Sequence, residues 1–147
     1  MDPNAERKTW MSLLARAPAQ LLADLWAKMG DEPEFEWLRA PEIGGAMVRG
    51  RMGGTGAAFN LGEMTVTRCS LRLADGAVGH AYVQGRDKPK AQIAALVDAL
   101  MQGPEARRIR HAILDPLGDK TEAKRTARAA KAAATKVEFF TMMRGED

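Results

Sequence analysis

The segment 63–84 constrains the fold more than any other part of the chain, because it has the pattern of two strands joined by a tight turn. Side chains from residue 63 to 73 alternate as in a strand with one buried face, and one alternating set is Thr65, Thr67, Cys69, Leu71 and Leu73. Asp75-Gly76 then predicts a hairpin with a type I′ turn, which requires positive φ at both central residues. Residues 77–84 return as the next strand.

Two shorter strands are expected before this hairpin, at residues 35–40 and 46–52. Gly44-Gly45 precedes the second of them, and a glycine-rich segment follows it. The four strands together predict an antiparallel meander. Because antiparallel sheets commonly pack one face on helices and leave the other in water, we expect an α+β fold in which helices cover a four-stranded sheet.

Apolar residues at helical spacing predict an N-terminal helical pair over residues 9–30, with Thr9 capping the first helix and Pro18 beginning the second. The clearest amphipathic stripe lies in residues 89–102 and consists of Ile93, Leu96, Val97, Leu100 and Met101.

The C-terminal third is expected to hold two helices and an apolar tail. A weaker helix over 105–114 is expected to close at Asp115-Pro116, because proline cannot continue it. The last helix is rich in Ala and is expected to begin at Asp119, with Glu122 at capping-box spacing. These expectations give a single domain over residues 1–147, divided into the helical pair 9–30, the sheet 35–84, the helices 89–136 and the tail 137–147.

Composition narrows the class of protein. Hydrophobic residues make up 46% of the chain, and the formal net charge of +3 permits an anionic partner but is too small to indicate nucleic acid. The single cysteine, Cys69, excludes an internal disulfide and a multi-cysteine zinc site, so a reducing compartment is expected. The N-terminus lacks the pattern of a secretory signal, and no apolar run reaches the ~20 residues of a membrane span. We therefore expect a cytoplasmic protein without membrane contact.

The glycine-rich segment 49–56 is the first candidate site. Its glycines let the backbone approach a ligand, successive N–H groups can form an anion-binding concavity, and an arginine adds charge. The segment lacks the Gly-Lys-Ser/Thr ending of a P-loop, and a flexible connection between strands is the commoner role of such a sequence. The candidate anion or partner contacts are Arg51, Gly53, Gly54, Thr55 and Gly56.

The segment 85–89 is the second candidate for an anion or partner contact. It leads into the helix over 89–102, whose free N–H groups and dipole favour an anion, and Arg86 and Lys88 would add positive charge. Alternatively, Asp87 or a neighbour caps the first turn of this helix. One segment can serve both purposes, so both interpretations stay open.

Two basic stripes are weaker signals. Arg68 and Arg72 share one face of a predicted strand. On the last helix, four basic residues fall close to one face, namely Lys120, Lys124, Arg128 and Lys131. Either stripe could face a partner, and the second could bind an acidic surface or nucleic acid. A solvated face is the commoner case, and no aromatic residues are interleaved on the helix to stack bases.

The tail, residues 137–147, is the strongest interaction signal. Its apolar cluster consists of Phe139, Phe140, Met142 and Met143. Burying a Phe or Met is worth ~1.5–3 kcal/mol, so leaving this cluster in water is costly. The tail must fold back onto its own core or dock on another chain.

The inventory of catalytic residues is small. His80 and His111 are the only histidines, so a His-rich metal site is not expected. Ser12 and Ser70 lack a nucleophile-elbow context, and Cys69 alternates with apolar residues as a core residue would. The chain is therefore predicted to hold no catalytic residue and no metal.

Several segments carry a family resemblance when they are taken together. They are Trp10-Met11, Arg51-Met52-Gly53-Gly54-Thr55-Gly56, Thr67-Arg68, Arg72-Leu73, Asp75-Gly76, Gly85-Arg86-Asp87-Lys88, Asp98-Ala99-Leu100-Met101-Gln102, Phe139-Phe140-Thr141-Met142 and Arg144-Gly145. In this order and spacing they resemble the PhnG family, a subunit of the carbon–phosphorus lyase core complex. The resemblance extends nearly end to end, and residues 105–135 match only in general character.

The resemblance implies an accessory role in phosphonate catabolism. The family acts in a core complex with PhnH, PhnI and PhnJ subunits, aided by an ATP-binding-cassette-type subunit. The complex forms α-D-ribose 1-methylphosphonate 5-triphosphate from ATP and methylphosphonate, and adenine is displaced. The nucleosidase-like step is attributed to PhnI and the radical cleavage to PhnJ, so iron–sulfur and metal sites are expected on partner subunits and no cofactor in this chain.

On this basis we expect the tail to dock on PhnI, and the two candidate segments to face the partner or its triphosphate ligand. Two other functions stay open. A free-standing anion- or RNA-binding module would bind with a steep salt dependence and need no protein partner. A small transferase acting alone would convert ATP and methylphosphonate unaided, which the scarcity of catalytic residues argues against.

Overall fold

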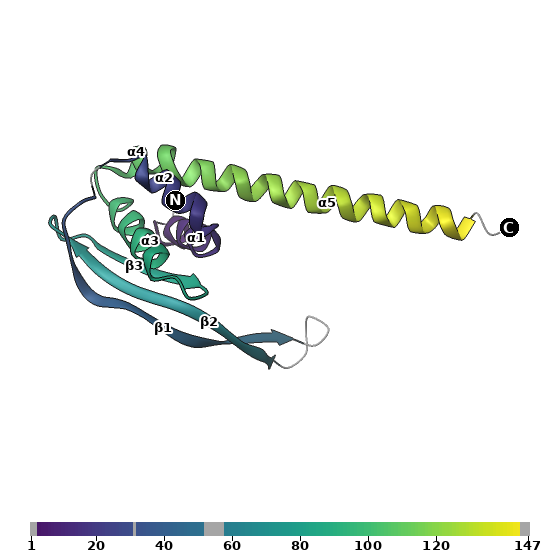
Figure 1. Cartoon of the computed structure of the whole chain (residues 1–147), viewed down its shortest axis with the longest axis horizontal. Coiled ribbons are helices and arrows are strands. Elements are labelled where there is room, and N and C mark those ends of the chain that lie inside the picture. Colours follow the sequence, from purple (N-terminus) through teal and green to yellow (C-terminus); the bar gives the residue numbers. More distant parts are fainter. Residues whose placement is uncertain (1–2, 31, 52–57, 145–147) are drawn as a thin grey trace.

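The computed structural model describes the backbone of residues 3–30, 32–51 and 58–144, and the side chains of residues 4–30, 32–47 and 62–137. In chain order the elements are helices α1 (Pro3–Arg16) and α2 (Ala19–Ala27), strands β1 (Phe35–Arg51), β2 (Ala58–Leu73) and β3 (Val78–Gln84), helices α3 (Lys88–Leu100) and α4 (Ala106–Ile109), the π-helical turn η2 (Arg110–Leu114) and helix α5 (Asp115–Arg144). The helices gather on one side of an antiparallel sheet (Figure 1). The expected α+β class is confirmed.

The expectation of four strands is wrong. Within the described residues the sheet has three strands in the order β1-β2-β3, because the segment predicted as strand 35–40 and residues 46–51 of the next predicted strand form one strand. Proline is tolerated only at sheet edges or irregularities. Strand β1 is one of the two edge strands, and its pairing with β2 shifts register between Arg39 and Glu42, where Pro41 lies.

The glycines that precede the predicted second strand lie within β1. Gly44 and Gly45 pair with Val66 and Thr65 of β2, and neither has a positive φ. A side chain at Gly45 would overlap the carboxylate of Glu63 on the paired strand. At this position glycine therefore allows close approach to a neighbouring side chain, and it does not end the strand.

The hairpin between β2 and β3 lies where the sequence places it, but its turn is of another type. Positive φ occurs at Gly76 (+95°) and not at Asp75, so the type I′ prediction is wrong. The N–H of Gly76 donates to the carbonyl of Leu73 (2.9 Å), and the N–H of Leu73 donates to the carbonyl of Ala77 (2.8 Å). This is the pattern of a three-residue loop with glycine in the left-handed position. The Asp75 carboxylate accepts from the N–H of Ala77 (3.0 Å) and so fixes the turn.

Helix α3 is the centre of the core. It packs on the inner face of the sheet, where the alternating set of β2 that begins at Thr65 is buried at Thr67, Cys69, Leu71 and Leu73. Its predicted stripe is buried at Leu96, Val97 and Met101, with Ile93 and Leu100 partly buried against the same core. Burial also extends round the rest of α3, to Ala91, Ala94, Ala95, Asp98 and Ala99. A helix buried on every side must have further elements on its outer surface.

Helices α1 and α2 supply part of that outer layer. The predicted stripes are confirmed, since Trp10, Leu14, Leu22 and Leu25 are all buried in the core. The predicted cap at Thr9 is wrong. Helix α1 already begins at Pro3, and the Thr9 hydroxyl donates back to the carbonyl of Ala5 (3.0 Å) within the helix.

The C-terminal helices do not break where the sequence predicts. Helix α4 continues through η2 into α5, so Asp115-Pro116 does not end a helix and α5 begins at Asp115, not at Asp119. The N–H of Asp115 bonds to the carbonyl of Arg110, five residues back. Such a wider turn lies directly before Pro116, which has no N–H to donate to an ordinary helical bond. The buried side chain of Leu117 anchors this joint in the core.

Two elements project away from this body (Figure 1). The first is an arm made of residues 45–51 and 58–65, which pair with each other but lie beyond the β2–β3 ladder. The second is α5, whose described side chains are exposed at every position from 119 to 137. Among the helices of the described residues, α5 alone leaves the body in this way (Figure 1). No helix in the described part of the chain is long and apolar enough to cross a membrane.

Candidate functional site

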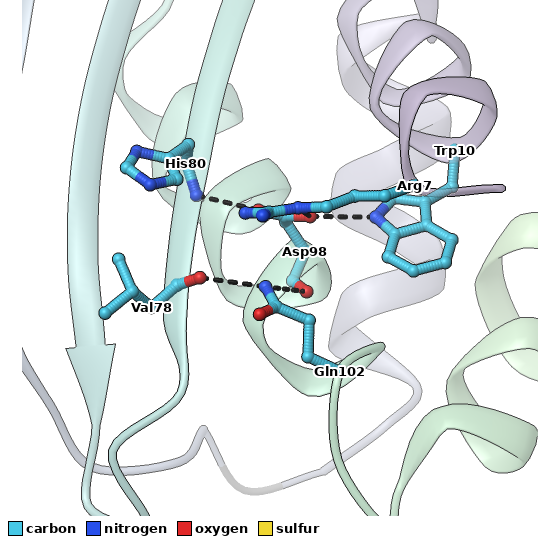
Figure 2. Close-up of polar contacts among 6 residues, drawn as sticks. All are labelled: Arg7, Trp10, Val78, His80, Asp98 and Gln102. Atoms are coloured by element: carbon cyan, nitrogen blue, oxygen red, sulfur yellow. Dashed lines mark hydrogen bonds and ion pairs between the residues drawn. The ribbon is translucent and has the colours of Figure 1, made fainter. Parts of the chain in front are cut away.

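The most highly connected polar group in the body is the carboxylate of Asp98 on α3 (Figure 2). Its side chain is fully buried. Oδ1 accepts from Arg7 Nε (3.1 Å) and from the indole N–H of Trp10 (2.8 Å). Oδ2 accepts from Arg7 Nη2 (2.8 Å) and from the backbone N–H of His80 (2.8 Å). One carboxylate therefore ties helix α1 and strand β3 to helix α3.

The same network closes the free edge of β3. This strand has β2 on one side only, so its outward backbone groups need other partners. The Asp98 carboxylate accepts from the N–H of His80, and Gln102 Nε2 donates to the carbonyl of Val78 (2.8 Å) and to that of Asp98 (3.1 Å). The side chains of Asp98 on α3 and of Gln102 in the turn after α3 thus take the place that a fourth strand would occupy at this end of the edge.

The role of the Asp98 carboxylate is structural. Both of its oxygens already accept two hydrogen bonds, so the carboxylate has no site at which to take a proton from a substrate. The guanidinium of Arg7 is about a third exposed, and its hydrogen bonds to Asp98 raise the pKa of Arg7 above the ordinary value. The His80 ring lies on the far side of the strand from Asp98 (Figure 2). The network therefore holds elements together and offers no general base.

Two other buried side chains that could be reactive, Cys69 and Lys90, are also engaged in hydrogen bonds. The thiol of Cys69 donates to the carbonyl of Ala91 (3.3 Å), and burial raises the pKa of this thiol to about 11. A thiol that stays protonated is a poor nucleophile. The ammonium of Lys90 donates to the carbonyl of Ala15 (3.1 Å). Burial lowers the pKa of Lys90, and the nearby negative charge of Asp87 offsets part of this change. Among the described side chains, every buried nitrogen and oxygen has a hydrogen-bond partner.

The segment 85–89 has the capping geometry that the sequence allowed. Asp87 is the N-cap of α3, and its carboxylate accepts from the N–H of Lys90 (2.9 Å). The hydroxyl of Thr67 accepts from the N–H of Asp87 (3.0 Å) and donates to the carbonyl of Gly85 (2.7 Å). The first turn of α3 thus already has a carboxylate on it. The side chains of Arg86 and Lys88 are exposed on either side of this cap, and their role as anion or partner contacts stays a prediction.

The other predicted site residues lie outside the part of the chain where side chains are described. Residues Gly53, Gly54, Thr55 and Gly56 fall in the gap between β1 and β2. Arg51 is the last residue of β1, and only its backbone is described. The apolar cluster Phe139, Phe140, Met142 and Met143 belongs to α5, again with only the backbone described. The predictions made for these residues remain predictions.

The two strand arginines do not form an unpaired basic stripe. Arg72 is paired with Glu36, and Arg68 with Glu42 at 3.6 Å, across the β1–β2 ladder. Beside these exposed ion pairs the sheet also exposes large apolar side chains. On β1 the side chains of Trp37, Leu38, Ile43 and Met47 are between 36% and 56% exposed.

The described residues offer no site for a metal ion. No group of three or more His, Cys, Asp or Glu side chains is close enough to hold one within the ranges where side chains are placed. His80 and His111 are both exposed and lie on different elements, β3 and η2.

Comparison with known proteins gives the family. Residues 5–145 match the family described as "Phosphonate metabolism protein PhnG". The chain belongs to the PhnG family. It is also 45% identical over 143 residues to the "Alpha-D-ribose 1-methylphosphonate 5-triphosphate synthase subunit PhnG" of Rhizobium meliloti (strain 1021). That match covers 97% of this chain and 92% of the relative, so the resemblance read from the sequence is confirmed.

For this member of the PhnG family, the residue that organises the body was not among the predicted sites. A single acidic residue interrupts the apolar run from Ala94 to Met101, and such an interruption was the available signal for a buried Asp98. Trp10, Asp98 and Gln102 all lie in segments that carried the family resemblance. In the structure these three side chains converge at one edge of the sheet (Figure 2).

Proposed function

We propose that this chain is a non-catalytic accessory subunit of α-D-ribose 1-methylphosphonate 5-triphosphate synthase. The observation that carries the proposal is the 45% identity, over 97% of the chain, to a relative named as the PhnG subunit of that enzyme. In this function the complex joins methylphosphonate to the ribose triphosphate of ATP and displaces adenine. The chain itself would contribute assembly and positioning.

The described residues support a division of labour between this chain and its partners. The buried reactive side chains are occupied: Asp98 with four donors, Cys69 as a protonated thiol and Lys90 against a backbone carbonyl. Catalytic groups would then come from other subunits. We assign the nucleosidase-like step to a PhnI-type partner, and radical cleavage with an iron–sulfur cluster to a PhnJ-type partner. PhnH-type and ATP-binding-cassette-type subunits would complete the assembly.

Co-expression tests the proposal. The neighbouring lyase subunits are expressed with and without this chain, and the purified complexes are supplied with ATP and methylphosphonate. We expect the chain to co-purify in a fixed ratio, and adenine release to be lost when it is omitted. A chain that stays monomeric beside its partners, or that converts the substrates alone, would contradict the proposal.

The segment containing Arg51, Gly53, Gly54, Thr55 and Gly56, together with Arg86 and Lys88, is proposed to contact the partner or its triphosphate ligand. Arginine and glycine-rich backbone suit anionic oxygens. Separate Arg51→Ala and Arg86→Ala variants distinguish the two contacts. Turnover that falls while assembly is retained indicates contact with the ligand, whereas assembly that falls first indicates an interface. Unchanged assembly and turnover would remove both assignments.

The apolar tail is proposed to dock on the PhnI-type subunit through Phe139, Phe140, Met142 and Met143. Truncation after residue 136 removes this cluster at the far end of α5 and leaves the residues of the core in place. We expect the truncated chain to keep the thermal unfolding of the body and to lose co-purification with PhnI. Retained stoichiometric assembly would remove the tail from the interface.

A further inference from the structure

Charge is distributed unequally between the projecting helix and the rest of the molecule. Residues 119–137 of α5 contain six basic and two acidic residues, a net charge of +4. The remainder of the chain contains 16 basic and 17 acidic residues, a net charge of −1. The positive net charge of this protein is therefore carried by one helix that stands away from the body (Figure 1).

Four of the basic residues form one surface, which we call the cationic face: Lys120, Lys124, Arg128 and Lys131. At 3.6 residues per turn these four positions fall within a sector of about 80°. All four side chains are exposed, and none makes an ion pair with the described part of the chain. The ion pair recorded on this part of α5, between Arg125 and Glu122 at 4.0 Å, lies off the cationic face.

The arrangement is unfavourable for an isolated helix. Lys120 and Lys124, and again Lys124 and Arg128, are four residues apart, where like charges repel on a helix surface. No packing offsets this repulsion, because residues 119–137 are exposed and the helix contacts the body only near its start. Its many alanines favour the helical state, but they bury little area by themselves. An acidic surface laid along the cationic face would turn each of these repelling charges into a paired one.

We propose that the cationic face of α5 docks onto an acidic protein surface on a partner subunit. This inference rests on the proposed function, because it takes the partner to be another subunit of the synthase. Charge complementarity defines the partner's contribution as a row of Asp and Glu side chains. Beside the cations, alanines at 123, 127, 130 and 134 let a second backbone approach closely, so the partner's acidic row would flank a close contact.

Two other occupants fit less well. A second copy of this chain would bring one helix of charge +4 against another, or against a body of charge only −1. Nucleic acid would supply the right charge, but residues 119–137 contain no aromatic side chain on which bases could stack. A shallow hollow on this helix is lined by Arg128, Lys131, Ala132, Thr135 and Lys136.

Charge reversal tests the proposal in the full-length chain. The variant is Lys124→Glu, Arg128→Glu and Lys131→Glu, which keeps the like-charge spacing and the helix propensity while inverting the sign. The control is Arg16→Glu, Lys28→Glu and Arg107→Glu, three exposed positions on the body with the same change in net charge. Circular dichroism and thermal unfolding establish that both variants fold as the wild type does.

The measurement is the association of each immobilised chain with the purified partner subunits at low and physiological ionic strength. Electrostatic steering acts mainly on association, so we expect the variant to associate at least about tenfold more slowly at low salt and the control less than about threefold more slowly. Wild-type association should itself slow as salt is raised.

Three outcomes would overturn the inference or the proposal beneath it. A variant that associates at the wild-type rate and affinity removes the cationic face from the interface, while the proposed function stands. A wild-type chain that binds an RNA or DNA oligonucleotide more tightly than the partner subunits, with only that binding lost in the variant, replaces the acidic protein by nucleic acid. Failure of the wild-type chain to bind any partner subunit contradicts the proposed function itself.

Discussion

Some charged side chains are buried and hydrogen-bonded in the body, whereas the described ones on the projecting helix α5 are exposed. In the body, Asp98 is fully buried and accepts four hydrogen bonds, and Lys90 is buried against a backbone carbonyl. On α5, Lys120, Lys124, Arg128 and Lys131 stand in water without an ion pair in the described residues. A buried charge is costly unless it is fully paired, whereas an exposed charge is nearly free of such constraint.

This difference separates what holds the fold from what is available for contact. A substitution in the body leaves unsatisfied partners behind, so its effect appears in stability. A substitution on the projections leaves only solvated groups, so its effect should appear in assembly. The four predictions that follow measure stability, and each compares a group in the body with a matched group at the surface or with a variant that lacks it.

The largest effect is expected for Asp98→Ala. This change leaves the Arg7 guanidinium, the Trp10 indole N–H and the His80 N–H without their acceptor. Breaking a buried pair by removing one partner costs about 3–5 kcal/mol, which should be measured as a lower free energy of unfolding in urea. Asp24→Ala is the control, because the side chain of Asp24 is exposed and accepts from the exposed side chain of Gln20. Equal effects of the two changes would mean that the Asp98 network does not stabilise the body.

The second prediction concerns the pH dependence set by Cys69. Burial raises the pKa of this thiol from 9.0 to about 11, so the folded state retains the proton more strongly than the unfolded chain does. The resulting stabilisation is complete below pH 9 and is lost as the pH rises through 11. Relative to Cys69→Ala, the free energy of unfolding should fall by about 2–3 kcal/mol over this window. Parallel pH profiles for the wild type and the variant would show that the thiol is not buried in this way.

The third prediction compares two glycines. An added Cβ at Gly79 of β3 would overlap the carbonyl oxygen of Ala95 and lie 2.9 Å from the backbone nitrogen of Ala99 on α3. Gly79→Ala should therefore lower the free energy of unfolding by about 1–3 kcal/mol, as overpacking does. Gly44→Ala is the control, because Gly44 has open space and no positive φ. If the two variants melted at the same temperature, β3 and α3 would not be in close contact.

The smallest effect is expected at the surface ion pair of Glu36 and Arg72. Both side chains are about half exposed, so water screens their attraction. A double-mutant cycle with Glu36→Ala and Arg72→Ala should give a coupling of about 0.2–1 kcal/mol. A coupling as large as that of the buried pair, measured with Arg7→Ala and Asp98→Ala, would contradict the contrast between the two regions.

Some features of the candidate sites could be predicted from the sequence and others could not. The position of Arg86 and Lys88 at the start of a helix was predictable, because glycine, a capping residue and proline stand together in the sequence. The capping role of Asp87 was one of two open interpretations, and the structure confirms it. The four-donor environment of Asp98 was not predictable. Its donors come from residues 7, 10 and 80, far from it in the chain.

The sequence by itself determined residues 63–73 of β2, strand β3, the place of the hairpin at Gly76, the apolar stripes of the helices and the family. Each of these depends on patterns within a few residues of one another. Only the tertiary structure decided that β1 runs through Pro41, that α4, η2 and α5 are continuous through Pro116, and that three strands suffice. The physical reason is that the cost of a proline or a glycine depends on its tertiary surroundings, which the local pattern does not contain. An edge strand tolerates a proline, a wider helical turn removes the need for its N–H, and side chains that cap a strand edge replace a further strand.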